Sequence, residues 1–355
     1  MTGMVALVSG ATGVVGRRLC IHLAAQGREV IGLSRRPPAE NARAAGVSYL
    51  PLDLTDRAAC AEALGAHAGI THYFHAARYD HVTTAPEPAD VNTAMLVNVL
   101  DAIETPRHAL HHVHLVEGTK YYGSNLGPFP TPAREDDPRS LQPNFYYDQE
   151  EVVFERGARN GWTWSASRPH GICDDNPSVA RSIPRVIGVY AEICRELGLP
   201  FSFPGTPENW RAIYQTTDCA HLARAITWMA TDPRAANQAY NITNGDYFRW
   251  ERMWPVLAEH FGLRAGPVQT VRLGQVMADK APVWERIVSR YGLQPVPFEQ
   301  AALWTYADFV FHPTWDMMSS TVKARQHGFH DVVDSEAMLK RLVASLRDQR
   351  LLPPA

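Results

Sequence analysis

The chain of 355 residues is long enough for one large α/β domain or two smaller ones. Hydrophobic residues make up 45% of it and charged residues 20%, which is the composition of an ordinary globular protein. Its net charge of −3 gives no electrostatic reason to expect nucleic acid or an anionic membrane as a partner. The sequence lacks the ~18–20 consecutive apolar residues that span a bilayer and the basic start of a secretory signal, so we expect a cytoplasmic protein that does not enter a membrane.

Cysteine and histidine spacing argues against a metal centre. The five cysteines are dispersed and form no Cys-x-x-Cys pair, which is typical of reduced thiols and not of a disulfide frame or a zinc site. The histidines of residues 108–114 alternate around a predicted strand and do not have the spacing of metal ligands. We therefore predict no metal site.

The first elements of the chain form a strand, a glycine-rich turn, a helix and a second strand. An apolar run at residues 4–8 precedes the turn, an amphipathic stretch at residues 17–26 follows it, and a second apolar run occupies residues 29–33. The spacing G-x-x-G-x-x-G lets the backbone approach a pyrophosphate, which the helix N-terminus then binds through its free N–H groups. A tight turn without a ligand is the alternative. The residues predicted to hold the pyrophosphate are Gly10, Thr12, Gly13, Val14, Val15 and Gly16.

The residues after the second strand distinguish between two nicotinamide cofactors. Sites for NAD commonly place Asp or Glu there, where it binds the ribose 2′-hydroxyl. This chain has Ser34, Arg35 and Arg36, which suit a 2′-phosphate, and we predict NADPH as the cofactor. A pair of solvated arginines is the alternative.

Three further strands are predicted in the first part of the chain. The third ends at Asp53 and Leu54, which we expect beside the adenine, and the fourth ends in small residues including Ala76, which let the backbone approach the cofactor. The fifth lies within residues 111–120, and a helix is predicted at residues 89–103. Alternating strands and helices indicate a Rossmann-type α/β fold, a doubly wound parallel sheet with its ligand beyond the carboxyl ends of the strands.

A catalytic lysine is missing where one class of reductase would carry it. In short-chain dehydrogenases a lysine one helical turn after the catalytic tyrosine lowers the pKa of that tyrosine. Here Glu150 stands four residues after Tyr146, and a glutamate there would raise the pKa. The nearest candidate cation is Lys120, just past the fifth strand. We predict that Lys120 and Tyr146 flank one pocket as the catalytic pair; a solvated lysine and a packing tyrosine are the alternatives.

Several unusual motifs resemble the progesterone 5β-reductase and iridoid synthase family of atypical short-chain dehydrogenases. The matches run along nearly the whole chain. They are "GTKYYG" (118–123), "GPF" (127–129), "EDDPR" (135–139), "NFYY" (144–147), "WSASRPHGI" (164–172), "AYNITNGDYFRWERMWPVLAEHFG" (239–262), "KAPVWERIV" (280–288) and "QHGF" (326–329).

The resemblance implies an enzyme that reduces the carbon–carbon double bond of enones with NADPH. The family uses the lysine of G-x-K and the first tyrosine of N-F-Y-Y, which fall here on Lys120 and Tyr146. This chain departs from the family in two places. Tyr121 stands where members often have histidine, and the fourth strand ends in "HAARYD", which is less apolar than expected. Both departures bear on the substrate more than on the chemistry.

The remainder of the chain is predicted to complete the sheet and to cover the substrate. We expect a dinucleotide-binding domain at residues 1–177, completed by about 213–245, and a mostly helical substrate-binding cap at residues 178–212 and 246–355. Trp210 is a candidate for the substrate loop. The backbone at Pro169, His170, Gly171 and Ile172 is predicted to contact the nicotinamide carboxamide, with no role for the histidine as a base. Aromatic residues expected to serve as cap core and pocket wall are Trp254, Phe261, Trp284, Tyr291, Trp304, Tyr306, Phe309 and Phe311.

These observations favour an NADPH-dependent reductase of α,β-unsaturated carbonyl compounds that takes a small apolar substrate. A carbonyl reductase or a sugar-nucleotide epimerase is the alternative enzyme. Either would require Ser or Thr beside the tyrosine and a lysine four residues later, and both are absent here. A silent NADP(H)-binding sensor needs only the glycine loop and the arginine pair. The sequence leaves the oligomeric state open, with a homodimer among the possibilities.

Overall fold

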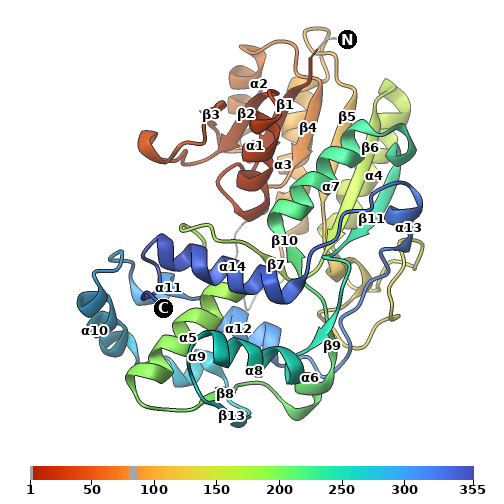
Figure 1. Cartoon of the computed structure of the whole chain (residues 1–355). Helices are drawn as coiled ribbons and strands as arrows, with labels where there is room; N and C mark the ends of the chain where they lie inside the picture. Colours follow the sequence, from red (N-terminus) through yellow and green to blue (C-terminus); the bar gives the residue numbers. More distant parts are fainter. Residues whose placement is uncertain (1–2, 80–86) are drawn as a thin grey trace.

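The computed structural model describes residues 3–79 and 87–355, and this part of the chain contains one seven-stranded parallel sheet (Figure 1). The strand order is β11-β6-β5-β4-β1-β2-β3, and each neighbouring pair is parallel. The strands of this sheet are β1 (Val5–Ser9), β2 (Glu29–Ser34), β3 (Val47–Pro51), β4 (His72–His75), β5 (His112–Val116), β6 (Thr163–Pro169) and β11 (Gln238–Ile242).

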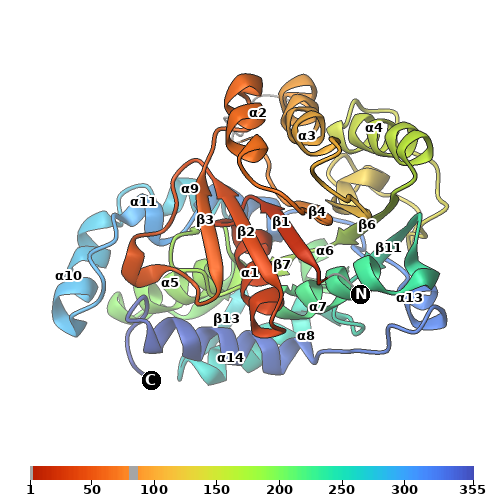
Figure 2. The same cartoon turned by 90° about the horizontal axis from the view of Figure 1, so that it is seen from above.

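Helices cover both faces of this sheet, as Figure 2 shows from above. On one face lie α1 (Val14–Ala25) and α7 (Cys219–Thr231); on the other lie α2 (Arg57–Gly65), α3 (Ala89–Ile103) and α4 (Phe145–Asn160). Strand β1 explains the two layers, because its side chains alternate between faces. Ala6 and Val8 pack with α1 and α7, whereas Leu7 packs with α2, α3 and α4.

The order of the strands reverses between β1 and β4. Strands β2 and β3 extend the sheet on one side of β1, and β4, β5, β6 and β11 extend it on the other. In open parallel sheets a ligand binds at this reversal, beyond the carboxyl ends of the strands. The predicted doubly wound fold is confirmed, and so is the helix at residues 89–103.

Most of the remaining helices of the second half of the chain form a region below the sheet (Figure 1). Its core gathers the aromatic side chains of Trp250, Trp254, Phe201, Phe203 and Phe311, all fully buried. Its helices are α5 (Ile183–Glu196), α6 (Pro207–Arg211), α8 (Trp250–His260), α9 (Leu273–Val276), α10 (Ala281–Tyr291), α11 (Phe298–Ala301), α12 (Trp304–Phe311) and α14 (Ser335–Asp348), whereas α13 (Val322–Gln326) packs beside β11 of the sheet.

Short elements complete the described chain. Strands β8 and β13 pair in parallel within the region predicted to be mostly helical. These elements are β7 (Ile172–Cys173), β8 (Phe201–Phe203), β9 (Ile213–Tyr214), β10 (Thr217–Asp218), β12 (Phe248–Arg249), β13 (Ala265–Val268) and the 3₁₀ turns η1 (Glu40–Ala42), η2 (Thr119–Tyr122) and η3 (Pro233–Ala235).

In the described ranges, no helix combines the length and the apolar character that crossing a bilayer requires. The five cysteines are buried and free.

Candidate active site

The glycine-rich turn lies where three backbone segments meet. Gly10 has a φ of +69°, and a Cβ built on it would lie 2.7 Å from the carbonyl oxygen of Ala76 at the end of β4. A Cβ on Gly16 would lie 2.2 Å from the carbonyl oxygen of Gly10. Both positions therefore exclude any side chain. Helix α1 begins after Gly13, which provides no side-chain cap, so the first N–H groups of the helix stay available to an anion.

A cavity of about 1400 Å³ runs from this turn along the carboxyl ends of the strands. Gly16 alone among the predicted site residues does not line it, because its role is to let α1 pack on the turn. The predicted residues that line the cavity are Gly10, Thr12, Gly13, Val14, Val15, Ser34, Arg35, Arg36, Asp53, Leu54, Ala76, Lys120, Tyr146, Pro169, His170, Gly171 and Ile172.

One end of this cavity is formed by the last residue of β2 and by residues that follow β3. The Ser34 side chain is buried, and its Oγ has no hydrogen-bond partner in the described structure. Arg35 and Arg36 are exposed at the cavity edge. The Asp53 carboxylate accepts the Thr55 N–H at 3.0 Å and its hydroxyl at 2.8 Å, and these hydrogen bonds lower the pKa of Asp53.

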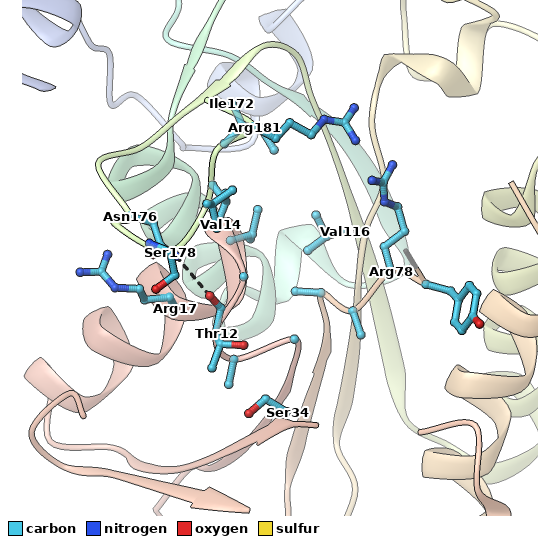
Figure 3. A pocket seen from close by; sticks show the side chains of 18 of the residues that line it. Thr12, Val14, Arg17, Ser34, Arg78, Val116, Ile172, Asn176, Ser178 and Arg181 are labelled. Carbon is cyan, nitrogen blue, oxygen red and sulfur yellow. Dashed lines mark hydrogen bonds between the residues drawn. The ribbon is translucent and has the colours of Figure 1, made fainter. Parts of the chain in front are cut away.

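The loop after β7 is held against the glycine turn. Asn176 donates from Nδ2 to the Thr12 carbonyl oxygen at 3.1 Å, the hydrogen bond drawn in Figure 3. Arg18, on the first helix, forms ion pairs with Asp174 and Asp175. This loop was not among the predicted site residues, because its role depends on contacts with a segment more than a hundred residues earlier in the chain.

Lys120 and Tyr146 line the same cavity and are joined through Asn144. Lys120 lies in η2 directly after β5, and Tyr146 lies in the first turn of α4. Asn144 Oδ1 accepts the Tyr146 N–H at 3.1 Å as the helix cap, and its Nδ2 donates to the Lys120 carbonyl oxygen at 3.2 Å. A Cβ built on Gly118 would lie 3.5 Å from the Tyr146 hydroxyl, an ordinary contact distance, so the phenol lies next to the backbone that precedes Lys120.

The charges around this pair set the protonation of both groups. Lys120 Nζ donates to Glu87 Oε1 at 3.0 Å, and Arg78 Nη1 donates to the same oxygen at 2.8 Å. Burial lowers the pKa of Lys120, and Glu87 opposes that shift. Burial raises the pKa of Tyr146, and the charge of Glu87 raises it further. The phenol is therefore a neutral hydrogen-bond donor near pH 7.

Glu150, which takes the place of the missing lysine, has a structural role. Its Oε1 accepts from Arg168 at 2.8 Å and its Oε2 from Arg139 at 3.0 Å. The pKa of Tyr146 is raised, but burial first and then the charge of Glu87 contribute most to this shift. The Glu150 carboxylate instead binds the guanidinium of Arg168, which packs against the turn that contains Lys120.

Arg168 supports the turn that carries Lys120. Its guanidinium lies 3.3 Å from the ring centroid of Tyr121 and donates to Tyr122 Oη at 3.2 Å. It also donates from Nε to Glu117 Oε2 at 2.8 Å. The charged groups of Arg168, Glu117 and Glu150 are all buried. Burial raises the pKa of Glu117, although the charge of Arg168 lowers it.

His170 is buried rather than exposed. Its Nδ1 shares a hydrogen bond with Thr119 Oγ1 at 2.8 Å, and its ring lies 5.0 Å from that of Tyr214. Its Nε2 has no partner in the described structure. Burial lowers the pKa of His170 to about 4, so the imidazole is neutral and free to bind a polar group of a ligand.

The end of the cavity beside Lys120 and Tyr146 contains residues that the sequence did not single out. Arg78 follows β4, Arg181 precedes α5, and Tyr214 lies in β9. Of the predicted aromatic residues, Tyr306 and Phe309 line the cavity. Trp254, Phe261, Trp284, Trp304 and Phe311 are buried in the helical core, Tyr291 is exposed, and Trp210 packs on that core and not in the cavity.

The chain is similar to known proteins both in its sequence and in its fold. A model of the NAD dependent epimerase/dehydratase family matches residues 6–243. The chain belongs to this family.

Within the epimerase/dehydratase family, the chain is 32% identical to the (S)-8-oxocitronellyl enol synthase of Catharanthus roseus, over 98% of this chain and 92% of that protein. It is 34% identical to the 3-oxo-Delta(4,5)-steroid 5-beta-reductase of Arabidopsis thaliana, over 92% of this chain and 87% of the relative. These relatives confirm the resemblance drawn from the motifs and the expectation of an oxidoreductase.

Solved structures of two epimerases share the fold. The UDP-glucose 4-epimerase of Thermotoga maritima, solved with UDP-glucose, superposes with a TM-score of 0.69 at 16% identity, over 97% of this chain and 99% of that one. The UDP-glucose 4-epimerase of Thermus thermophilus, in complex with NAD, gives 0.66 at 19% identity with the same coverage. The family is dependent on a nicotinamide dinucleotide.

Proposed function

We propose that the protein is an NADPH-dependent reductase that adds hydride to the β-carbon of α,β-unsaturated carbonyl compounds. The observation that carries the proposal is the presence of Lys120 and Tyr146 in the wall of the cavity that begins at the glycine turn. The relatedness to a steroid 5-beta-reductase supports the same class of reaction.

The residues along the cavity fit NADPH. The closely packed Gly10 and the uncapped start of α1 suit a pyrophosphate, and His170 Nε2 is an unpartnered group at the other end. The buried, unpartnered Ser34 Oγ and the exposed Arg35 and Arg36 suit a 2′-phosphate in place of a 2′-hydroxyl. When bound, the reduced nicotinamide supplies the hydride.

Tyr146 and Lys120 stabilise the negative charge that develops on the carbonyl oxygen as the substrate becomes an enolate. The raised pKa of Tyr146 keeps its phenol protonated, so that it donates a hydrogen bond to this oxygen. Lys120 adds positive charge from the adjacent strand end, directly or through Tyr146. A preorganised donor of this kind contributes about 2.7–4 kcal/mol to catalysis. The α-carbon then takes its proton from water.

The proposed reaction explains why a lysine four residues after the tyrosine is not needed. Alcohol oxidation needs a tyrosine that acts as a base, whereas conjugate reduction needs a neutral donor. Glu150 is then free to bind Arg168, which supports the Lys120 turn. Phe145, Tyr214, Leu303, Tyr306 and Phe309 line the same cavity and provide apolar surface for the body of the substrate.

The proposal is tested by the consumption of NADPH with one enone and with the matched saturated ketone. We expect turnover of the enone, with the saturated ketone as its product, and little further reduction of that ketone. A faster reduction of the ketone would favour a carbonyl reductase with the same Lys–Tyr pair. Replacing NADPH by NADH checks the cofactor: we expect a lower kcat/KM with NADH, because Arg35 and Arg36 lose the 2′-phosphate.

A further inference from the structure

Three cations surround the substrate end of the cavity. Arg78 and Lys120 follow the adjacent strands β4 and β5, and Arg181 reaches the same space from the loop before α5. Figure 3 shows the side chains of Arg78 and Arg181 extending toward one another across the cavity opening. Among the described residues one carboxylate, that of Glu87, is bonded to this group, and it pairs with Arg78 and Lys120. Among the residues that the structure describes, positive charge therefore exceeds negative charge here.

The other acidic side chains in the described cavity wall cannot balance this excess. Glu117 is paired with Arg168, and Asp53 binds Thr55 at the opposite end. Arg181 forms no ion pair with any described residue, and its guanidinium lies 5.0 Å from the ring centroid of Tyr306. An apolar cleft with an unbalanced arginine at its edge differs from a site shaped for a wholly uncharged molecule.

The position of Arg181 distinguishes a substrate group from a cofactor phosphate. Burial lowers the pKa of Lys120, and the charges of Arg181 and Arg78 lower it further. The same two arginines act on Tyr146, where they oppose the effect of burial. Both guanidinium groups are therefore near the catalytic pair. The phosphates of a dinucleotide are expected at the other landmarks, the start of α1 and the end of β2.

We propose that the substrate carries a carboxylate in addition to its unsaturated carbonyl, and that Arg181, assisted by Arg78, binds this carboxylate. The inference rests on the proposed reductase function and names its substrate class: unsaturated oxo acids with an apolar chain between the two groups. The fork of a guanidinium matches a carboxylate with two parallel hydrogen bonds, and its stacking on Tyr306 leaves the N–H edge available. Tyr306 and Phe309 would contact the apolar chain.

The test uses the full-length enzyme with NADPH and a series of 2-enals that bear a terminal carboxylate on chains of increasing length. Each acid is compared with its methyl ester, which has the same enal and the same chain but no charge. We expect kcat/KM to be about tenfold or more higher for the acid at the best chain length. Arg181→Met, which keeps an apolar side chain over Tyr306, is expected to reduce this acid-to-ester ratio toward one, and Arg181→Lys to retain part of it.

Arg252→Met is the matched control, because Arg252 is an exposed arginine of α8 outside the cavity and its loss changes the net charge equally. This variant should keep the wild-type ratio. Equal kcat/KM for acids and esters in the wild-type enzyme would overturn the carboxylate assignment while leaving the reductase function intact. A rise in the KM for NADPH in Arg181→Met, with the acid-to-ester ratio unchanged, would assign the arginine to the cofactor and also overturn it. A preference for matching phosphate monoesters over the carboxylates would exclude a carboxylate as the anion.

A binding measurement separates this inference from the reductase proposal. Saturated oxo acids and their esters are titrated calorimetrically into the NADP⁺-loaded protein. If no enal is reduced but the acids bind more tightly than the esters, and Arg181→Met abolishes the difference, the reductase proposal fails and the carboxylate site stands. If neither turnover nor a binding preference is seen, both fail.

Discussion

The two ends of the cavity are built in different ways. The cofactor end consists of short local motifs, the glycine turn and the residues that directly follow β2 and β3. The substrate end gathers Arg78, Lys120, Tyr146, Arg181 and Tyr306 from separate segments that range from the end of β4 to α12. A motif that acts through its backbone shape can be predicted from consecutive residues of the sequence. A pocket made of side chains from distant segments can be identified only from the tertiary structure. The predictions below separate these two kinds of construction.

The largest effect is expected from Arg168→Met, which removes the support of the substrate end. The substitution leaves Glu117 and Glu150 buried without their shared cation, and breaking such a pair typically costs about 3–5 kcal/mol. We expect a corresponding fall in the free energy of unfolding, measured by urea denaturation. Arg139→Met is the matched control, because Arg139 also pairs with Glu150 but is one-third exposed, and its loss should cost less than ~1 kcal/mol. Equal losses in the two variants would contradict the proposed support.

Tyr146→Phe is expected to lower kcat for enone reduction by about 10²–10³-fold, because the donor to the enolate oxygen is lost. Affinity for NADPH, measured by fluorescence titration, should change little. The adjacent tyrosine provides the control: Tyr147 Oη accepts the Ser140 N–H at 2.8 Å and donates to the Tyr121 carbonyl oxygen. Tyr147→Phe should therefore cost about 1 kcal/mol of stability with kcat retained. Full activity of Tyr146→Phe would remove the assignment.

At the cofactor end, Gly10→Ala is expected to weaken NADPH binding about tenfold or more, since a loop displacement that costs ~1.4 kcal/mol already has this effect. The methyl group would lie 2.7 Å from the Ala76 carbonyl oxygen. Gly27→Ala controls for backbone strain, because Gly27 has a φ of +72° but an added Cβ there meets no described atom within 4 Å. That variant should lose about 1–2 kcal/mol of stability and keep its affinity for NADPH. If both variants bind NADPH equally well, close approach at Gly10 is unimportant.

The smallest effect is expected in the pH profile. The Lys120 ammonium is charged below its folded pKa and neutral above it, and burial holds that pKa below the usual ~10.4 of lysine. Enone reduction should therefore decline as pH rises through this lowered pKa, whereas the Tyr146 phenol, with its raised pKa, stays protonated over that range. Lys120→Met should lose about tenfold in rate, less than Tyr146→Phe because Glu87 already offsets part of the charge.

The alkaline decline should vanish in Lys120→Met and persist in Lys323→Met. Burial lowers the pKa of Lys323 as well, but its ammonium donates to the Ala239 carbonyl oxygen outside the cavity. A decline that survives the loss of Lys120 would assign it to another group.

The sequence by itself determined the doubly wound sheet, the positions of its first strands and the glycine turn. Each of these follows from the alternation of apolar runs or from glycines that no other residue can replace, as at Gly10. The sequence also named Lys120 and Tyr146 as a candidate pair, with the help of motifs that resemble the progesterone 5β-reductase and iridoid synthase family. It gave a signal for Arg78 as well, in the unusually polar end of the fourth strand.

Only the tertiary structure decided what surrounds that pair. Glu150, expected to raise the pKa of Tyr146, is bound to Arg168, and His170 is buried against Thr119. Arg181 carries no sequence signal, because nothing near it in the chain indicates that its loop faces the end of β4. The direction of a charged side chain depends on the partners that the strand order and the helical region bring next to it. Because these partners are distant in the sequence, local sequence patterns do not predict them.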